Sequence, residues 1–300
     1  MPTINPADAK MIQRATYASV CVATILLGIK FFGWWVTHSV SLQASLIDSL
    51  LDALASVINM VAVHHALKPA DKEHRFGHGK AESLAALGQA FFIAGTSLWL
   101  LFEAREHFLM PHPIEASGTG LAVMSIAMVM ALILIAYQGA VVKKTNSVAI
   151  AADRVHYQSD LLINLAVIIS LLSAEFFNFD MIDPICGCLI GIYILWTAWK
   201  ITLHAFNVLM DRELEDGERE KILKIIKAHP DVIGVRDLRT RSSGLQQFVQ
   251  LRLLVEPTHS LSTAHEIAEA VEKEIVQACP ASQVMIRLIP VHHEKHTSAT

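Results

Sequence analysis

The sequence predicts a polytopic α-helical membrane domain with six transmembrane helices, followed by a small α+β domain. Only 17% of the 300 residues are charged and 53% are hydrophobic, with a mean hydropathy of +0.43, whereas an average soluble domain has about 25% charged residues. Apolar runs long enough to cross a bilayer of about 30 Å recur up to residue 209. After Asp211 the sequence becomes charged and periodic. We therefore expect a membrane domain over 1–209, a second domain over 210–290 and a disordered tail over 291–300.

The connectors between the predicted spans alternate in charge. The spans are expected at roughly 12–36, 40–66, 82–108, 118–142, 147–174 and 182–208. Lys and Arg residues mark one side, in the N-terminal segment, in the connector after the second span and at Lys143 and Lys144. The connectors of the other side contain no Lys or Arg, and Arg105 near the end of the third span is the nearest exception. By the positive-inside rule, both termini lie in the cytoplasm.

The segment after the last span predicts an αββαβ order. Amphipathic helices are expected over 216–229 and 261–278, the second with Ser262 or Thr263 as its N-cap. Strands are expected over 232–244, 245–256 and 282–291, which gives a sheet with two helices on one face. The polar tail contains three histidines that either bind metal loosely or have no fixed role: His292, His293 and His296.

Two pairs of ionisable residues lie inside apolar spans, Asp48 and Asp52 in the second and His156 and Asp160 in the fifth. A four-residue step is about one helical turn, so each pair points to one side of its helix. An ionisable group at bilayer depth costs roughly 2.5 to 3.5 kcal/mol or more and is usually functional. The alternative is a set of hydrogen-bonded structural groups, but two matched pairs favour a site. Three carboxylates and an imidazole predict a tetrahedral site for a divalent transition metal.

The charge of this quartet predicts how it works. With three ionised carboxylates and a neutral imidazole, the empty site carries −3 in a low-dielectric environment and should take up protons. A divalent ion lowers the charge to −1 and expels those protons, because metal ligands must be deprotonated. His156 is the group expected to titrate near neutral pH, since histidine ordinarily titrates at about 6.5. If the site faces one side of the membrane at a time, competition between metal and protons becomes antiport.

A second candidate site lies in the connector after the second span. Asp71, His74 and His78 follow one another with spacings of x2 and x3 in a segment rich in turn residues. They are suited to binding one metal ion, and a solvated polar loop is the alternative. Gly187 and Gly191 form a G-x-x-x-G pattern that favours close helix packing, with a dimer seam as one option.

The remaining composition excludes several classes of protein. A net charge of −4 gives no sign of nucleic-acid binding, and no organic cofactor is expected. The N-terminus lacks the features of a signal peptide. The cysteines form no C-x-x-C pair and are expected to be buried apolar thiols rather than disulfides or zinc ligands: Cys21, Cys186, Cys188 and Cys279.

Several long segments resemble the cation diffusion facilitator family, most closely its bacterial branch of zinc and ferrous-iron exporters. The matching segments are FFGWWVTHSVSLQASLIDSLLDALAS, PADKEHRFGHGKAESLAAL, ADRVHYQSDLLINLAV, IGIYIL and VRDLRTRSSG. The resemblance implies a homodimer in the bacterial inner membrane with a metallochaperone-like cytoplasmic dimerisation domain. It assigns the transport site to Asp48, Asp52, His156 and Asp160, a loop site to Asp71, His74 and His78, and a charge interlock between the domains to Lys80 and Asp211.

The chain departs from this family at the cytoplasmic metal cluster. By the same resemblance, cluster positions are occupied here by Arg236, Arg252, Arg287 and Ile289, and His265 is the one matching histidine that remains. Arginine has no lone pair for a metal, so a metal cluster is doubtful. Arginines can instead hold the dimer interface by pairing with carboxylates.

The expected function is proton-coupled export of divalent transition metals. A membrane metalloenzyme is disfavoured because the sequence has no H-E-x-x-H motif and the quartet leaves no open coordination position. A metal sensor or scaffold with little flux is the remaining alternative. The donor set suits Zn²⁺, Cd²⁺, Fe²⁺, Mn²⁺ or Co²⁺, and intrinsic affinity does not select among them in the cell.

Overall fold

The computed structural model describes residues 6–37, 40–109, 118–177 and 182–291. The chain divides into two compact units, a helical one over Pro6–Leu209 and a smaller one that begins at Met210. The three tail histidines, His292, His293 and His296, lie outside the described residues.

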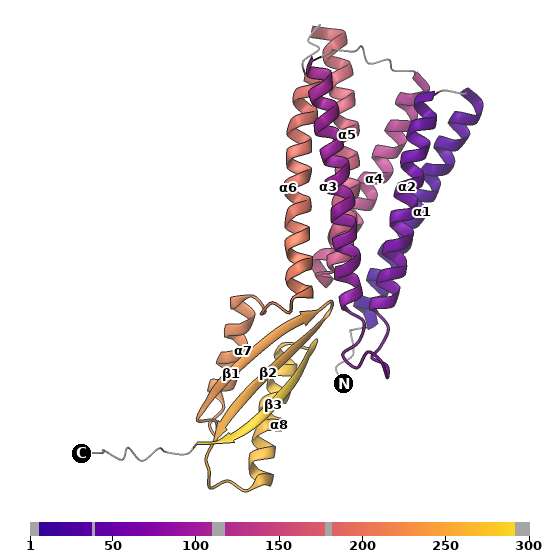
Figure 1. Ribbon diagram of the computed structural model, residues 1–300. Coiled ribbons are helices and arrows are strands. Elements are labelled where there is room, and N and C mark those ends of the chain that lie inside the picture. The colour runs from indigo at the N-terminus through magenta and orange to yellow at the C-terminus, as the bar shows by residue number, and fades with distance from the viewer. Residues whose placement is uncertain (1–5, 38–39, 110–117, 178–181, 292–300) are drawn as a thin grey trace. The chain divides into compact units, whose positions relative to one another are not determined.

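The helical unit consists of six long helices (Figure 1). They are α1 (Pro6–Thr37), α2 (Val40–Ala66), α3 (Lys80–Leu109), α4 (Gly118–Thr145), α5 (Val148–Phe177) and α6 (Ile182–Leu209). The predicted helical spans are thereby confirmed. Within the described residues, every one of these helices except α5 is long and apolar enough to cross a membrane. The first half of α5 carries three charged residues, Asp153, Arg154 and Asp160.

The G-x-x-x-G pattern packs α6 against α3, the helix with which α6 makes its most extensive contact (Figure 1). A Cβ atom on Gly191 would lie 2.8 Å from Cδ2 of Leu101, and one on Gly187 would lie 3.1 Å from Cβ of Ala104. The hydroxyl of Ser97 donates to the carbonyl oxygen of Gly191 at 2.6 Å. The glycines therefore serve packing within the chain, and the pattern needs no dimer seam to account for it.

A buried carboxylate ties α5 to three neighbouring helices. Asp153 is fully buried and accepts a hydrogen bond from the hydroxyl of Ser19 on α1 at 2.5 Å. It also accepts from Nε2 of Gln138 on α4 at 2.6 Å and from Nε2 of Gln89 on α3 at 3.0 Å. A buried charge persists only when it is paired or hydrogen-bonded. Because Asp153 lies about one turn before His156, this network fixes the helix that carries half of the predicted quartet.

A second buried carboxylate secures the start of α5. Glu82 of α3 accepts hydrogen bonds from the hydroxyl of Ser147 and, at 3.3 Å, from the backbone N–H of Ala149. The first N–H groups of a helix have no partner within the helix, and they favour a negative charge. Glu82 therefore caps α5 from a neighbouring helix.

The smaller unit confirms the predicted αββαβ order. It comprises α7 (Asp216–Ala228), β1 (Gly234–Ser243), β2 (Gln246–Val255), α8 (Leu261–Ala278) and β3 (Ser282–Pro290). The strand order is β1-β2-β3, with β1 antiparallel and β3 parallel to β2. Its core joins both helices to the sheet through Ile222, Ile226, Leu251, Leu253, Val271 and Ile275.

Two local predictions are wrong. The N-cap of α8 is Ser260, whose hydroxyl accepts from the N–H of Thr263 at 3.2 Å. The helix therefore begins at Leu261, and Ser262 and Thr263 lie in its first turn. Cys21 is an exposed free thiol on α1 rather than a buried one, because it faces the outside of the helical unit, where a bilayer would cover it.

Candidate metal centres

Three of the four residues of the two predicted pairs meet between α2 and α5. Nε2 of His156 lies 3.1 Å from Oδ1 of Asp52 and 3.8 Å from Oδ2 of Asp160. One ligand atom from each of these residues lies within 4.8 Å of the others. Metal–ligand bonds of about 2.0–2.1 Å in a tetrahedron separate the ligand atoms by about 3.4 Å, so the observed distances bracket those of a metal site.

The imidazole of His156 is fixed by its surroundings. It is 4% exposed and packs edge-on against Phe92 and Tyr157, with ring centroids 5.9 and 5.6 Å away. Within the described residues its buried Nε2 makes no hydrogen bond of good geometry, although Asp52 is close. A buried nitrogen that faces two carboxylates without a proper hydrogen bond is well placed to bind a cation.

Asp48 lies apart from this group. It is one turn before Asp52 on α2 and is exposed, whereas Asp52 is half-buried. The structure thus brings together three of the four predicted transport ligands, and Asp48 lines the cavity next to them.

The quartet lines a cavity of about 620 Å³ whose walls come from α2, α3, α5 and α6. Along α3 the lining runs from Phe92 to His107, and along α5 from His156 to Ala166. Both ranges lie on the C-terminal side of the buried network, since Gln89 and Asp153 precede them in their helices. In both helices the cavity therefore lies farther from the N-terminal end of the helix than the network does.

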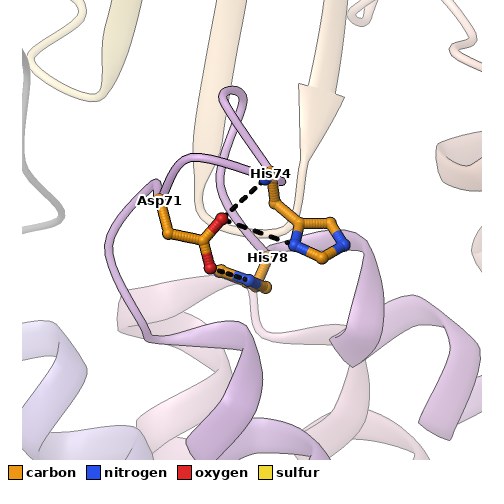
Figure 2. Close-up of side chains that lie close together, drawn as sticks. All are labelled: Asp71, His74 and His78. Atoms are coloured by element: carbon orange, nitrogen blue, oxygen red, sulfur yellow. Dashed lines mark hydrogen bonds and ion pairs between the residues drawn. The ribbon is translucent and has the colours of Figure 1, made fainter.

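The loop between α2 and α3 brings together the second predicted group (Figure 2). Nε2 of His78 lies 3.3 Å from Oδ2 of Asp71, and Nδ1 of His74 lies 3.5 Å from Oδ1 of the same carboxylate. These separations also match the edge of a tetrahedral site of about 3.4 Å. Asp71 and His74 are exposed, and His78 is buried.

Backbone groups hold the Asp71 carboxylate in position. Its Oδ1 accepts from the N–H of His74 at 2.6 Å and from the N–H of Glu73 at 2.9 Å. The first of these bonds is the main cause that lowers the pKa of Asp71 below its ordinary value. Gly77 has a φ of 81°, which glycine adopts without strain, and its N–H donates to the carbonyl of His74 at 3.0 Å. The turn thereby presents an ionised carboxylate to both imidazoles.

Sequence reasoning missed His65, which lies next to this loop. Its ring centroid is 4.7 Å from that of His78, with the rings edge to face. His65 belongs to the last turn of α2, so the sequence assigns it to the apolar span rather than to the loop motif. A histidine directly before a candidate metal loop is the signal that could have found it.

The sequence matches decide the family. Residues 16–210 match the family model described as cation efflux transmembrane domain, and residues 214–291 match the cation efflux protein, cytoplasmic domain. The chain belongs to the cation efflux family. The predicted resemblance to the cation diffusion facilitators is thereby confirmed.

Relatives of this cation efflux protein match over nearly its whole length. It is 43% identical to the cation-efflux pump FieF of Klebsiella pneumoniae subsp. pneumoniae, covering 96% of this chain and 95% of the relative. It is also 43% identical to FieF of Yersinia enterocolitica, covering 98% of each. A solved structure of CzrB, 27% identical, covers 26% of this chain and 99% of that chain with a TM-score of 0.26.

The cytoplasmic unit of this family member carries a row of arginines. Arg236 pairs in register with Arg252, and Arg252 pairs with Arg287, across the three strands. Nη1 of Arg252 lies 2.8 Å from Oδ2 of Asp237, within the same chain. His265 on α8 contacts Glu269 at 3.4 Å. Within the described residues, His265 joins no group of metal-binding side chains, and its predicted part in a cytoplasmic site stays a doubtful prediction.

The residues of the predicted interlock have other partners within their own units. Nζ of Lys80 donates to the carbonyl of Leu209 at 3.2 Å in the helical unit. Oδ1 of Asp211 lies 3.1 Å from Nη1 of Arg241 in the cytoplasmic unit. The Lys80–Asp211 pair would join the two units and stays a prediction.

Proposed function

We propose that this cation efflux protein is a proton-coupled antiporter that exports divalent transition-metal cations from the cytoplasm across the bacterial inner membrane. The observation that carries the proposal is the group Asp52, His156 and Asp160, whose ligand atoms lie within 4.8 Å of one another in a cavity that Asp48 also lines. A divalent ion at this place would have two to three carboxylates and one imidazole as ligands. That donor set suits Zn²⁺, Fe²⁺, Cd²⁺, Mn²⁺ and Co²⁺.

The charge of the empty site couples metal transport to proton transport. Three ionised carboxylates around a cavity between apolar helices repel one another, so the empty site takes up protons. A divalent cation replaces these protons because both compete for the same lone pairs. Each transport cycle then moves metal one way and protons the other, provided that the cavity opens to one side at a time.

The distribution of Lys and Arg along the chain supports export as the direction of transport. The helix ends that carry Lys80, Lys143 and Lys144 lie in the cytoplasm by the positive-inside rule. Along α3 the cavity lies farther from Lys80 than the network does, and it would open toward the periplasm. The buried network of Asp153 would then lie on the cytoplasmic side of the cavity, which supports the proposal of a conformation that releases cargo to the periplasm.

The functional unit of the proposal is a homodimer. The match to the cytoplasmic domain of the family and the metallochaperone-like order αββαβ support dimerisation through this domain. The loop group Asp71, His74 and His78 is proposed as a regulatory metal site, because it lies in the connector and outside the cavity.

Flux in proteoliposomes tests the proposal. Uptake of Zn²⁺, Fe²⁺, Cd²⁺, Mn²⁺ and Co²⁺ is followed under an imposed pH gradient and without one. The proposal expects metal uptake that rises with the gradient and a matching proton flux. Asp52→Asn should abolish both, and Glu103→Gln, which alters a carboxylate elsewhere on the same cavity wall, should keep most of the flux. Metal binding without flux would favour a sensor or scaffold instead.

A further inference from the structure

The loop group has three ligands, and a fourth imidazole lies beside it. Structural zinc sites almost always have four protein ligands, whereas sites with three leave one position open to water or substrate. The ring centroid of His65 lies 4.7 Å from that of His78, and the ring centroid of His74 lies 4.6 Å from that of His78. The buried His78 thus packs against two further imidazole rings.

Local backbone structure holds His65 close to the loop. α2 ends at Ala66, and the carbonyl of His65 accepts from the N–H of Lys68 at 3.1 Å as the chain turns away from the helix. His78 stands two residues before the start of α3. The two histidines therefore lie at opposite ends of the connector, and the turn brings their rings into contact.

A role at the helix end does not distinguish His65 from its neighbour. His64 and His65 are both exposed and both lie in the last turn of α2, where a positive charge interacts favourably with the helix dipole. His65 alone of the two contacts a loop histidine ring among the described residues. The helix dipole therefore does not account for the contact between the rings of His65 and His78.

We propose that the His65 imidazole, whose nitrogens lie outside the 4.8 Å group that Asp71, His74 and His78 form, turns toward a bound ion and becomes the fourth ligand of the loop metal site. One carboxylate and three imidazoles then form a closed tetrahedral site for Zn²⁺ or a similar divalent transition metal, and this inference rests on the loop group being a metal site as proposed above. The ion links the end of α2 to the approach of α3. With no position open, such a site retains its ion rather than passing it on, which does not suit a step in transport.

The test is a Zn²⁺ titration of the full-length protein in detergent, with Asp52→Ala and Asp160→Ala present to remove the transport site. Four variants are compared in this background, and one of them, His74→Ala/His78→Ala, tests the loop site itself. His65→Phe keeps a ring against His78 but has no nitrogen, His65→Ala removes the ring as well, and His64→Ala is the matched control. Loss of groups that merely orient metal ligands weakens affinity by about 10- to 100-fold, so loss of a direct ligand should weaken it by at least about tenfold.

The expected result is weaker Zn²⁺ binding in both His65 variants and unchanged binding in His64→Ala. Zinc X-ray absorption should show the imidazole ligands falling from three (His65, His74 and His78) to two in the His65 variants. Equal affinity and an unchanged imidazole number in His65→Phe would overturn the role of His65 and leave the loop site intact. Unchanged binding in His74→Ala/His78→Ala would show instead that the loop is no metal site, and the inference would fail with it.

Discussion

The two groups of metal-binding side chains have similar residues and similar spacings but opposite surroundings. In both, imidazole nitrogens lie 3.1 to 3.8 Å from carboxylate oxygens. The group of Asp52, His156 and Asp160 lines a cavity between apolar helices, and Asp48 adds a third carboxylate. The loop group has the single carboxylate of Asp71, which backbone N–H groups hold ionised.

The difference in charge separates the roles of the two groups. A divalent ion leaves the quartet at −1 and the loop group at +1, and the empty quartet carries −3 against −1 for the empty loop group. Only the quartet has a surplus of charge that must be neutralised by protons when the metal leaves. The comparison therefore predicts that one group exchanges its ion and the other holds it.

The largest expected effect is the loss of metal flux when a residue of the quartet is replaced. Asp52→Ala or Asp160→Ala removes a ligand and a negative charge, so metal flux should fall by at least about 100-fold while the dimer still folds. His156→Asp keeps the number of ligands but replaces nitrogen with oxygen, so the flux ratio of Mn²⁺ to Zn²⁺ should rise. The measurement is metal uptake into proteoliposomes, with Glu103→Gln as the control. Flux near that of the parent in either alanine variant would remove the quartet from the transport path.

A smaller effect is expected from the loop. His74→Ala/His78→Ala should lose one bound metal per protomer and retain part of the flux, because the quartet is unchanged. Metal analysis of the purified protein gives the stoichiometry, and the same uptake measurement gives the flux. A correctly folded variant with no flux at all would place the loop on the transport path and erase the contrast between the two groups.

The buried hydrogen-bond network of Asp153 should contribute to the thermal stability of the helical unit. Asp153→Ala removes the acceptor of Nε2 of Gln89 and one of the two acceptors of Nε2 of Gln138, which also donates to the hydroxyl of Ser19 at 2.9 Å. Each buried N–H group left unpaired costs about 1–3 kcal/mol. The midpoint of thermal unfolding in detergent should therefore fall clearly, whereas Glu103→Ala, which alters an exposed side chain, should leave it almost unchanged. Equal midpoints would mean that the network does not hold α5 in place.

The smallest effect concerns the cytoplasmic unit. If Arg236, Arg252 and Arg287 hold the dimer by ion pairs, a fragment of residues 211–300 should dimerise equally with Zn²⁺ or with a strong chelator. Its dimerisation should weaken at high salt, because exposed ion pairs are screened. Sedimentation at low and high salt checks both points. Dissociation by the chelator, or tight binding of two zinc ions per fragment, would contradict the role given to the arginines.

Periodicity in the sequence predicts the helices and strands, because each helix or strand must bury one face. The four-residue steps likewise predict that Asp48 and Asp52 share one side of their helix. The same step predicts that His156 and Asp160 share one side of theirs. Contacts that depend on how one helix is placed against another are not predicted in this way. The partners of Asp153 come from three other helices, and the position of Asp48 at the cavity wall depends on the placement of α2.

The predictions of two local features, the N-cap of α8 and the surroundings of the loop site, fail for another reason. Three hydroxyl side chains lie within four residues at the start of α8, and only the backbone geometry selects Ser260 as the cap. His65 was missed because its assignment to an apolar span conceals its contact with the loop.

Proton release on metal binding tests the contrast between the two groups most directly. Protons released per Zn²⁺ are counted in weakly buffered solution between about pH 5.5 and 7.5, for His156→Ala/Asp160→Ala and for His74→Ala/His78→Ala. Asp71 should stay ionised over this range because its pKa is lowered, so this carboxylate should release no proton when the loop binds metal. The account predicts that release at pH 7.5 persists in the loop variant and disappears in the quartet variant. Equal release from both variants at pH 7.5, or quartet affinity independent of pH, would contradict it.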